Sequence, residues 1–316
     1  MFQSLLLLTL TNLFSPGWAP SDSQPSTTGS NPIPLQHYVN DTSHLVAPGA
    51  QLVKISDQFS FTEGPAADKK GNIYFTDQPN DNIWKFDTKG RLNLFMTGAK
   101  RSNGLYFDRR WNLLACADAN NEIIKIDGKK NIEVLVGKVN GHRLNGPNDL
   151  WVDADGGIYF TDPLYKRPYW THEGPDMPGE HVYYFNPVTK NVTRVDSSLR
   201  KPNGIIGTPD GKYLYIADIG DNKTYRFTIT GKGTIGEKKL FASAGSDGLT
   251  IDHLGNVYLT GSGIGVYNPA GEKISQINVP EGWTANLCFG GKKRDMLFIT
   301  ASKAVYTLKM NVHGTR

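Results

Sequence analysis

The chain has 316 residues, of which 38% are hydrophobic and 11% aromatic, so it is long enough to bury a large core in one or two domains. Its 34 glycines and 18 prolines favour many turns over long helices. The formal charge is only +4, and the lysines and arginines are scattered singly, so a nucleic-acid-binding surface is not expected.

The N-terminal region has the composition of a targeting segment followed by a tether. Residues 1–20 contain no charged side chain and carry an apolar run from Leu5 to Leu10, and we interpret them as a cleaved signal peptide. Residues 21–48 begin with a stretch rich in Ser, Thr and Pro and are expected to form a flexible linker. The apolar run is too short to span a bilayer. The sequence therefore predicts export to the periplasm or the extracellular space, with no membrane span.

One pattern recurs six times from residue 51 onward. Each copy has a short apolar strand, a polar turn that usually contains Asp and Gly, and a second strand rich in Ile, Tyr, Phe and Leu. Two weaker strand-like runs follow. Four short strands per unit, at spacings of 39 to 55 residues, are typical of propeller blades. We therefore expect residues 49–312 to form an all-β, six-bladed β-propeller.

The segment 51–60 precedes the first repeat and has no blade of its own. The last repeat has no fourth strand-like run after residue 310. We expect the N-terminal segment to supply the outermost strand of the last blade, which would close the ring and remove an open sheet edge.

A polar residue stands at the start of the first strand in every repeat. The six positions are Glu63, Asn103, Asn148, Asn203, Asp247 and Asn286. The first strand of each blade lines the central channel and all six begin at the same end, so these side chains are expected to converge on one axial point. Local turn chemistry could explain any one of them, but it would also accept Gly, Ser or Pro.

Two of these six residues carry carboxylates. Glu63 and Asp247 would repel each other across a narrow channel unless a cation lay between them. An all-oxygen cluster without imidazole suits one hard divalent cation, and we expect Ca²⁺ first. Mg²⁺, Mn²⁺ and Zn²⁺ are the other candidates, although zinc normally recruits His or Cys.

A second acidic series ends the second strand of the first four repeats. It consists of Asp77, Asp118, Asp162 and Asp218, and the last two repeats carry Gly261 and Ala301 at that position. Asp followed by a polar loop is a common turn cap, and this is the role that we expect for the series.

The long loop of the third repeat, residues 163–181, leaves from the same end of the channel. We expect its residues Tyr165, Trp170 and His172 to contact a polar substrate, with a plain solvated loop as the alternative. Arg143 lies in a segment that enters the same face and is a further candidate for a substrate contact.

Four motifs resemble one known family, and they occur in order at matching repeat positions: FTEGP, RLNGPNDLWVDADGGIYFTDPLY, KPNGI and SDGLTID. They are similar to the gluconolactonase branch of the family that includes senescence marker protein and luciferin-regenerating enzyme, over about residues 55–310. The resemblance implies a six-bladed propeller with one divalent cation, commonly Ca²⁺, in the channel, and it implies hydrolysis of sugar lactones.

The resemblance also assigns roles to several members of the axial series. It places metal ligands on Glu63, Asn203 and Asp247, with Asn148 as a ligand or close neighbour. Asn103 becomes a substrate or outer contact, whereas Asn286 has no counterpart in that ligand set.

The resulting hypothesis is a secreted, metal-dependent lactonase that acts on a small sugar lactone or a similar cyclic ester. The cation would polarise the carbonyl, and Asp247 would orient or deprotonate the attacking water. An arylesterase-like or phosphotriesterase-like hydrolase on the same scaffold is one alternative, and a non-catalytic, calcium-stabilised binding propeller is another. The sequence does not specify the lactone, the metal loaded in the cell or the oligomeric state.

Overall fold

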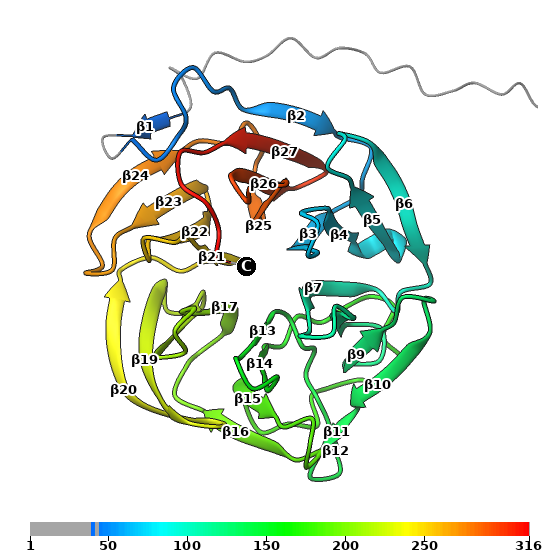
Figure 1. Cartoon of the computed structure of the whole chain (residues 1–316). Coiled ribbons are helices and arrows are strands. Elements are labelled where there is room, and N and C mark those ends of the chain that lie inside the picture. The colour runs from blue at the N-terminus through cyan, green and yellow to red at the C-terminus, as the bar shows by residue number, and fades with distance from the viewer. Residues whose placement is uncertain (1–38, 42–43, 316) are drawn as a thin grey trace, which may run out of the picture. The chain divides into compact units, whose positions relative to one another are not determined.

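The computed structural model describes residues 39–41 and 44–315. The predicted signal peptide, residues 1–20, and most of the predicted linker lie outside the described residues. Six main antiparallel sheets are arranged around a central axis as the blades of a propeller (Figure 1). The predicted all-β, six-bladed architecture is confirmed. None of the helices in the described part of the chain has the length and apolar character needed to cross a lipid bilayer.

Each of the first four blades is a meander of four antiparallel strands that follow the chain order outward from the axis. Blade one contains β3 (Thr62–Ala67), β4 (Ile73–Asp77), β5 (Asn82–Phe86) and β6 (Leu92–Thr97), with the short 3₁₀ helix η2 (Gln78–Asn80) after β4. Blade two contains β7 (Ser102–Phe107), β8 (Leu113–Ala117), β9 (Glu122–Ile126) and β10 (Ile132–Val136). Blade three contains β13 (Leu150–Val152), β14 (Ile158–Asp162), β15 (His181–Phe185) and β16 (Val192–Asp196), preceded by the small hairpin β11 (Lys138–Val139) and β12 (His142–Arg143). Blade four contains β17 (Pro202–Gly207), β18 (Tyr213–Asp218), β19 (Lys223–Gly231) and β20 (Thr234–Ala242).

The last two blades include strands from near the N-terminal end of the described chain. Blade five contains β21 (Leu249–Ile251), β22 (Val257–Gly261), β23 (Gly263–Tyr267) and β24 (Lys273–Ile277), and β1 (Val39–Asp41) pairs with β24. Blade six contains β25 (Thr284–Gly290), β26 (Met296–Ala301) and β27 (Ala304–Lys309). Its outer neighbour is β2 (Val53–Ser56), which runs antiparallel to β27 with Lys54 opposite Tyr306.

The hydrophobic core lies between neighbouring blades. Strand alternation sends every second side chain of a blade toward the next blade, so each gap is filled by residues from two sheets. The gap between blades six and one shows this directly, because the rings of Phe75 and Phe298 have centroids 5.3 Å apart. The closed ring thus stacks each blade against two others and holds the inner strands around the axis.

Glycines let the inner strands approach one another at the axis. In four blades the axial polar residue is followed by glycine, as in Glu63-Gly64 and Asn203-Gly204. A Cβ atom on Gly64 would lie 2.1 Å from the backbone oxygen of Asn103, and one on Gly204 would lie 2.6 Å from that of Asp247. Any side chain there would force adjacent blades apart. The repeated glycine therefore brings the preceding polar side chains close to the axis.

Candidate active site

The axial residues surround a hollow of about 230 Å³ at the end of the channel where the inner strands begin. Glu63, Asn103, Asn148 and Asp247 line it. Its other lining residues are Phe61, Tyr165, Arg167, Ile219 and Trp283. We call this space the axial hollow. Residues far apart in the sequence thus meet at one place, as the repeat pattern predicts.

Glu63 is the most enclosed acid of the axial hollow, with 2% of its surface exposed. Its Oε2 accepts hydrogen bonds from the backbone N–H of Gly64 at 2.6 Å and from Nδ2 of Asn286 at 3.1 Å. Burial raises the pKa of Glu63 well above its usual value, and the negative charges of Asp247 and Asp149 raise it further. The acid is therefore in a position that strongly favours a neighbouring positive charge.

Asp247 precedes β21 and is oriented by an indole. Nε1 of Trp283 donates a hydrogen bond to its Oδ2 at 2.6 Å. Removal from water raises the pKa of Asp247 to about 6, against the opposing effects of the hydrogen bonds from Trp283 and Asn203 and of the positive charge of Arg167. A carboxyl group with such a pKa is ionised at neutral pH and remains able to accept a proton.

The side-chain oxygen of Asn203 receives no hydrogen bond from any donor among the described residues. The residue is 1% exposed, and its Nδ2 donates to the hydroxyl oxygen of Tyr165 at 3.0 Å. Its Oδ1 is buried and accepts no hydrogen bond. A buried, unpaired oxygen is costly unless something positive faces it. Asn203 does not itself line the axial hollow, but its hydrogen-bond partner Tyr165 does. With the two acids of raised pKa, this oxygen gives a set of oxygen donors of the kind that a hard divalent cation prefers.

The other asparagines of the axial series are tied to their neighbours. Nδ2 of Asn103 donates to the backbone oxygen of Asn148 at 3.2 Å, which links blades two and three at the hollow. Asn286 does not line the hollow, and its Nδ2 bridges Glu63 and Asp149 beneath it. Asn286 therefore acts here as a partner for carboxylates. No group of three or more His, Cys, Asp or Glu residues suited to a metal occurs among residues 39–41 and 44–315, so the candidate set depends on its amides.

Asp149 is a buried acid near the axis that the sequence reasoning missed. It follows Asn148, at the position where four other blades carry glycine, and it is 6% exposed. Burial raises its pKa to about 7, against hydrogen bonds from Leu150 N–H and from Asn286. The break in the polar-residue-then-glycine pattern is the sequence signal that could have identified it.

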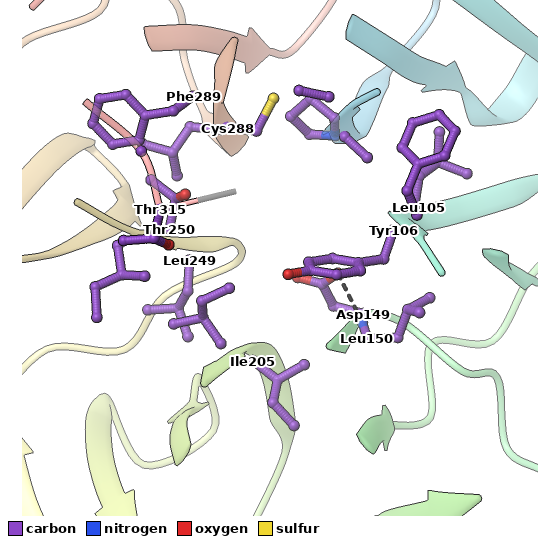
Figure 2. Close-up of a pocket in the computed structure, with 18 residues that line it drawn as sticks. Leu105, Tyr106, Asp149, Leu150, Ile205, Leu249, Thr250, Cys288, Phe289 and Thr315 are labelled. Atoms are coloured by element: carbon purple, nitrogen blue, oxygen red, sulfur yellow. Dashed lines mark hydrogen bonds between the residues drawn. The ribbon is translucent and has the colours of Figure 1, made fainter. Parts of the chain in front are cut away.

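Asp149 also lines a second hollow of about 80 Å³, further along the inner strands. Figure 2 shows this space, with Leu105, Leu249 and Phe289 around it. Thr315 reaches it from the C-terminal segment. Asp149 carries the one carboxyl group among its described lining residues, and the space is much smaller than the axial hollow, which brings Glu63 and Asp247 together. The axial hollow is therefore the better candidate for chemistry.

The third-blade loop brings two residues to the axial hollow and is fastened to blade two. Tyr165 and Arg167 line the hollow. Nε of Arg167 and the hydroxyl of Tyr169 donate to Oδ2 of Asp118 at 2.6 and 2.7 Å, and Nε1 of Trp170 donates to the Asp118 backbone oxygen at 2.7 Å. We call this set of contacts the Asp118 clasp. It fixes residues 165–170 over one side of the hollow.

Three residues predicted to contact substrate lie away from the lining of the axial hollow. Trp170 takes part in the Asp118 clasp and stacks on His172, with ring centroids 4.8 Å apart. Arg143 pairs with Asp176 at 3.3 Å and donates to the backbone oxygen of Gly174. These contacts hold the loop. Of the loop candidates, Tyr165 is the one that the structure places at the hollow.

The acidic series at the ends of the second strands divides into two roles. Asp77, Asp162 and Asp218 each accept hydrogen bonds from two backbone N–H groups of the segment that precedes the inner strand. These three carboxylates do cap backbone N–H groups, but those groups belong to the segment before the inner strand and not to the loop that follows the aspartate. Asp118 differs, because its carboxylate accepts hydrogen bonds from the side chains of Gln78, Arg167 and Tyr169.

Phe61 and Trp283 are further lining residues that the sequence reasoning did not single out. Each is followed by a buried threonine at the start of an inner strand, Thr62 and Thr284. An aromatic–threonine pair just before an axial position is the shared signal. Its meaning depends on the ring geometry, because only the closed ring turns these aromatic side chains toward the axis.

Comparison with known proteins points to one family. The family model described as the SMP-30/gluconolactonase/LRE-like region matches residues 61–303. A gluconolactonase of Zymomonas mobilis subsp. mobilis is 26% identical over 290 residues, which cover 82% of this chain and 81% of the relative. Lactonase drp35 of Staphylococcus haemolyticus is 26% identical over 245 residues, 72% of each chain. A solved gluconolactonase structure from Xanthomonas campestris superposes with a TM-score of 0.82 at 26% identity, covering 89% of this chain and 98% of that one.

Proposed function

This chain belongs to the SMP-30/gluconolactonase/LRE-like family, and from that premise we propose that it is a lactonase that opens a sugar lactone at the axial hollow with the help of one divalent cation. The observation that carries the proposal is that the buried acid Glu63 and the partly buried acid Asp247 share the axial hollow, with the unpaired oxygen of Asn203 nearby. The gluconolactonases and lactonases among its relatives supply the class of substrate.

Four residues would hold the cation: Glu63, Asn203, Asp247 and Asn148. Their oxygens are the ligand type that Ca²⁺ prefers, and two carboxylates would compensate the charge of a divalent ion. A bound cation would supply Lewis-acid polarisation of the lactone carbonyl at this place. Ca²⁺ is the proposed ion, with Mg²⁺, Mn²⁺ and Zn²⁺ as the ions to compare.

The chain's own residues account for the rest of the reaction. Asp247, held by the Trp283 indole, accepts a proton from the water that attacks the carbonyl carbon. The ring C–O bond then breaks, the released oxygen takes up a proton, and the product is an open hydroxy acid. Asn103 and Tyr165 line the same space and orient the substrate. The clasped loop reduces the access of bulk water.

An activity assay on metal-free protein tests this proposal. We expect no hydrolysis of D-glucono-1,5-lactone after exhaustive chelation, and recovery when Ca²⁺, Mg²⁺, Mn²⁺ or Zn²⁺ is added singly. Each ion should also raise the melting temperature if it binds the native state. Full activity of protein shown by elemental analysis to be metal-free would overturn the metal dependence. Absence of lactone hydrolysis under every condition would overturn the activity.

The same assay separates the alternatives. Aryl esters and phosphotriesters in the substrate panel test for an arylesterase-like or phosphotriesterase-like enzyme on this scaffold. A cation that raises the melting temperature without conferring any hydrolysis would identify a binding propeller whose ion is structural.

We further propose that the protein is exported and that residues 49–312 act as one propeller domain. The export proposal rests on the uncharged, apolar character of residues 1–20. N-terminal sequencing of protein secreted by a suitable host tests it, with removal of about the first 20 residues as the expected result.

We also infer that β2 closes the ring. Its pairing with β27 joins an N-terminal segment to the last blade. Leu52, next to β2, is fully buried in the core of blades five and six. The pairing gives β27 a neighbour on its outer side.

A further inference from the structure

A groove adjoins the axial hollow on the side of blade five. It has a volume of about 280 Å³ and shares two lining residues, Ile219 and Trp283, with the axial hollow. We call it the blade-five groove. Residues after β18 bound it on the blade-four side, and residues 259–263 bound it on the blade-five side. The two spaces therefore meet at a common wall.

The groove exists because blade five lacks two side chains that other blades carry. At the end of the second strand, blades one to four have aspartate, whereas blade five has Gly261. The second difference lies on the third strand, opposite the residue two places before the end of the second strand. In the other five blades a large side chain stands there: Trp84, Ile123, Tyr183, Tyr225 and Tyr306. In blade five the residue there is Gly265, opposite Leu259.

Gly265 faces directly into the groove. A Cβ atom on it would lie 3.1 Å from Cε2 of Tyr267 and 3.6 Å from Cε of Lys273, and both of those residues line the groove. Its backbone does not have a positive φ angle, so the position accepts other residues without backbone strain. The glycine is therefore required by neither a turn nor a left-handed conformation. A side chain here would make the Tyr267 ring shift slightly and would take up space in the groove.

Trp283 connects the groove to the proposed general base. The indole N–H holds Asp247, whereas the opposite edge of the ring faces the groove, with Cη2 3.8 Å from the Cβ position of Gly261. A ligand in the groove would touch the same indole that orients Asp247. The groove and the axial hollow therefore lie on two sides of the same indole ring.

The size and lining of the two spaces indicate the ligand. Each alone is smaller than the roughly 300 Å³ at which ligand pockets usually begin, and together they fall within that range. The groove presents polar groups from Asn222, Ser262, Lys273 and Gln276 beside the Trp283 ring. Hydrogen-bonding groups next to an aromatic surface suit a polyhydroxy ring better than an alkyl chain.

We propose that the blade-five groove is a subsite for a glycosyl substituent, so that the enzyme acts on lactones of glycosylated sugar acids. This inference rests on the proposed lactonase function. The lactone ring would occupy the axial hollow, and the second sugar would extend past Trp283 into the groove. The structure thereby narrows the substrate class to aldonolactones that carry a further sugar.

The test compares D-glucono-1,5-lactone with cellobiono-1,5-lactone, which adds one glucosyl unit. For the wild type we expect a kcat/KM about tenfold higher on the disaccharide lactone, a change typical of one additional set of subsite contacts. Gly265→Tyr restores the residue type that three other blades carry and fills the groove. It should reduce the ratio of the two kcat/KM values to about one while leaving hydrolysis of gluconolactone within about twofold.

Gly236→Tyr is the matched control, because Gly236 lies on β20 away from the groove and its Cβ position is 3.6 Å from a methyl group of Thr230. It should leave the ratio unchanged. If Gly265→Tyr does not fold, Lys273→Ala removes a polar group without filling space and should raise KM for the disaccharide lactone alone.

Three results would overturn the subsite. They are equal kcat/KM values for both lactones in the wild type, a preference that survives Gly265→Tyr, or a larger preference for an alkyl-substituted lactone that Gly265→Tyr removes. If neither sugar lactone is hydrolysed, the proposed function fails. The subsite is then tested by calorimetry, as the affinity of cellobionate for the wild type and for Gly265→Tyr. Weaker binding to Gly265→Tyr is expected, and equal affinities would overturn the subsite.

Discussion

Asp247 and Glu63 differ in what surrounds them, and this assigns them different roles. Glu63 is enclosed by a backbone N–H, an amide and two other negative charges, so it is suited to holding a cation. Asp247 is partly exposed to the hollow and is oriented by Trp283. The latter arrangement suits a group that must meet water and accept a proton.

Replacement of Asp247 tests that difference. Asp247→Asn should lower kcat for lactone hydrolysis by about 100-fold or more, because general-base assistance contributes roughly 10² to 10⁴. The amide oxygen can still face a cation, so metal content measured by elemental analysis should fall less than kcat. The exposed Asp155→Asn is the control and should change neither quantity. Full turnover in Asp247→Asn would remove Asp247 from the reaction.

Asp162 supplies a prediction on stability and pH. Burial raises its folded-state pKa from 3.8 to about 7, against two backbone hydrogen bonds. The protonated form is therefore favoured in the fold, so the stabilisation from this group is present below the unfolded pKa and is lost as pH rises through the folded pKa. Asp162→Asn cannot titrate.

Urea unfolding of both proteins at pH 5 and pH 8 measures this effect. Between pH 5 and pH 8 the wild type should lose on the order of 2 kcal/mol of unfolding free energy that Asp162→Asn keeps. A constant difference between the two proteins across this range would show that the Asp162 carboxyl does not titrate in the fold as described.

At the scale of elements, the loop 163–181 owes its position to blade two. The Asp118 carboxylate lies at the end of the second strand, where three other blades use aspartate to cap the segment before the inner strand. Here it accepts hydrogen bonds from Arg167 and Tyr169 instead. Tyr165 and Arg167 therefore reach the axial hollow from a loop that is held at one acidic side chain.

Asp118→Asn should loosen this loop. We expect faster hydrogen exchange in residues 163–171 and a loss of about tenfold in kcat/KM, since small displacements of positioning groups cost up to about 10². Glu173→Gln is the matched control, because Glu173 is an exposed acid of the same loop and takes no part in the Asp118 clasp. Unchanged exchange and activity in Asp118→Asn would show that other contacts hold the loop.

At the scale of the whole propeller, neighbouring blades pack against each other around the axis, and β2 pairs with β27. The segment that leads into β2 also buries Leu45, Val46 and Leu52 in the core of blades five and six. Each fully buried side chain of this kind contributes about 2 kcal/mol.

Removal of residues 1–57 should therefore lower the melting temperature by roughly ten degrees or more, as expected when several kcal/mol are lost from a domain of this size. Removal of residues 1–38, which leaves β1 and β2 in place, is the control and should change the melting temperature little. Equal melting temperatures for the two truncations would contradict the closing role of β2.

The sequence by itself determined the parts of this protein that are repeated. Six copies of a strand–turn–strand pattern indicate six blades, because each blade must bury both faces against similar neighbours. The same repetition located the polar axial series, and Glu63 and Asp247 could be expected to face one another because a ring brings equivalent positions together. Those predictions needed only periodicity and the turn chemistry of Asp and Gly.

The tertiary structure decided everything that depends on departures from the repeat. Trp283 lines the axial hollow and Asp149 the second hollow, Trp170 and Arg143 make contacts within the loop region, and Gly265 lines the blade-five groove. Each depends on the direction of one side chain relative to a neighbouring blade. Sequence periodicity fixes which residues are equivalent, but only packing in three dimensions fixes what an exceptional residue meets.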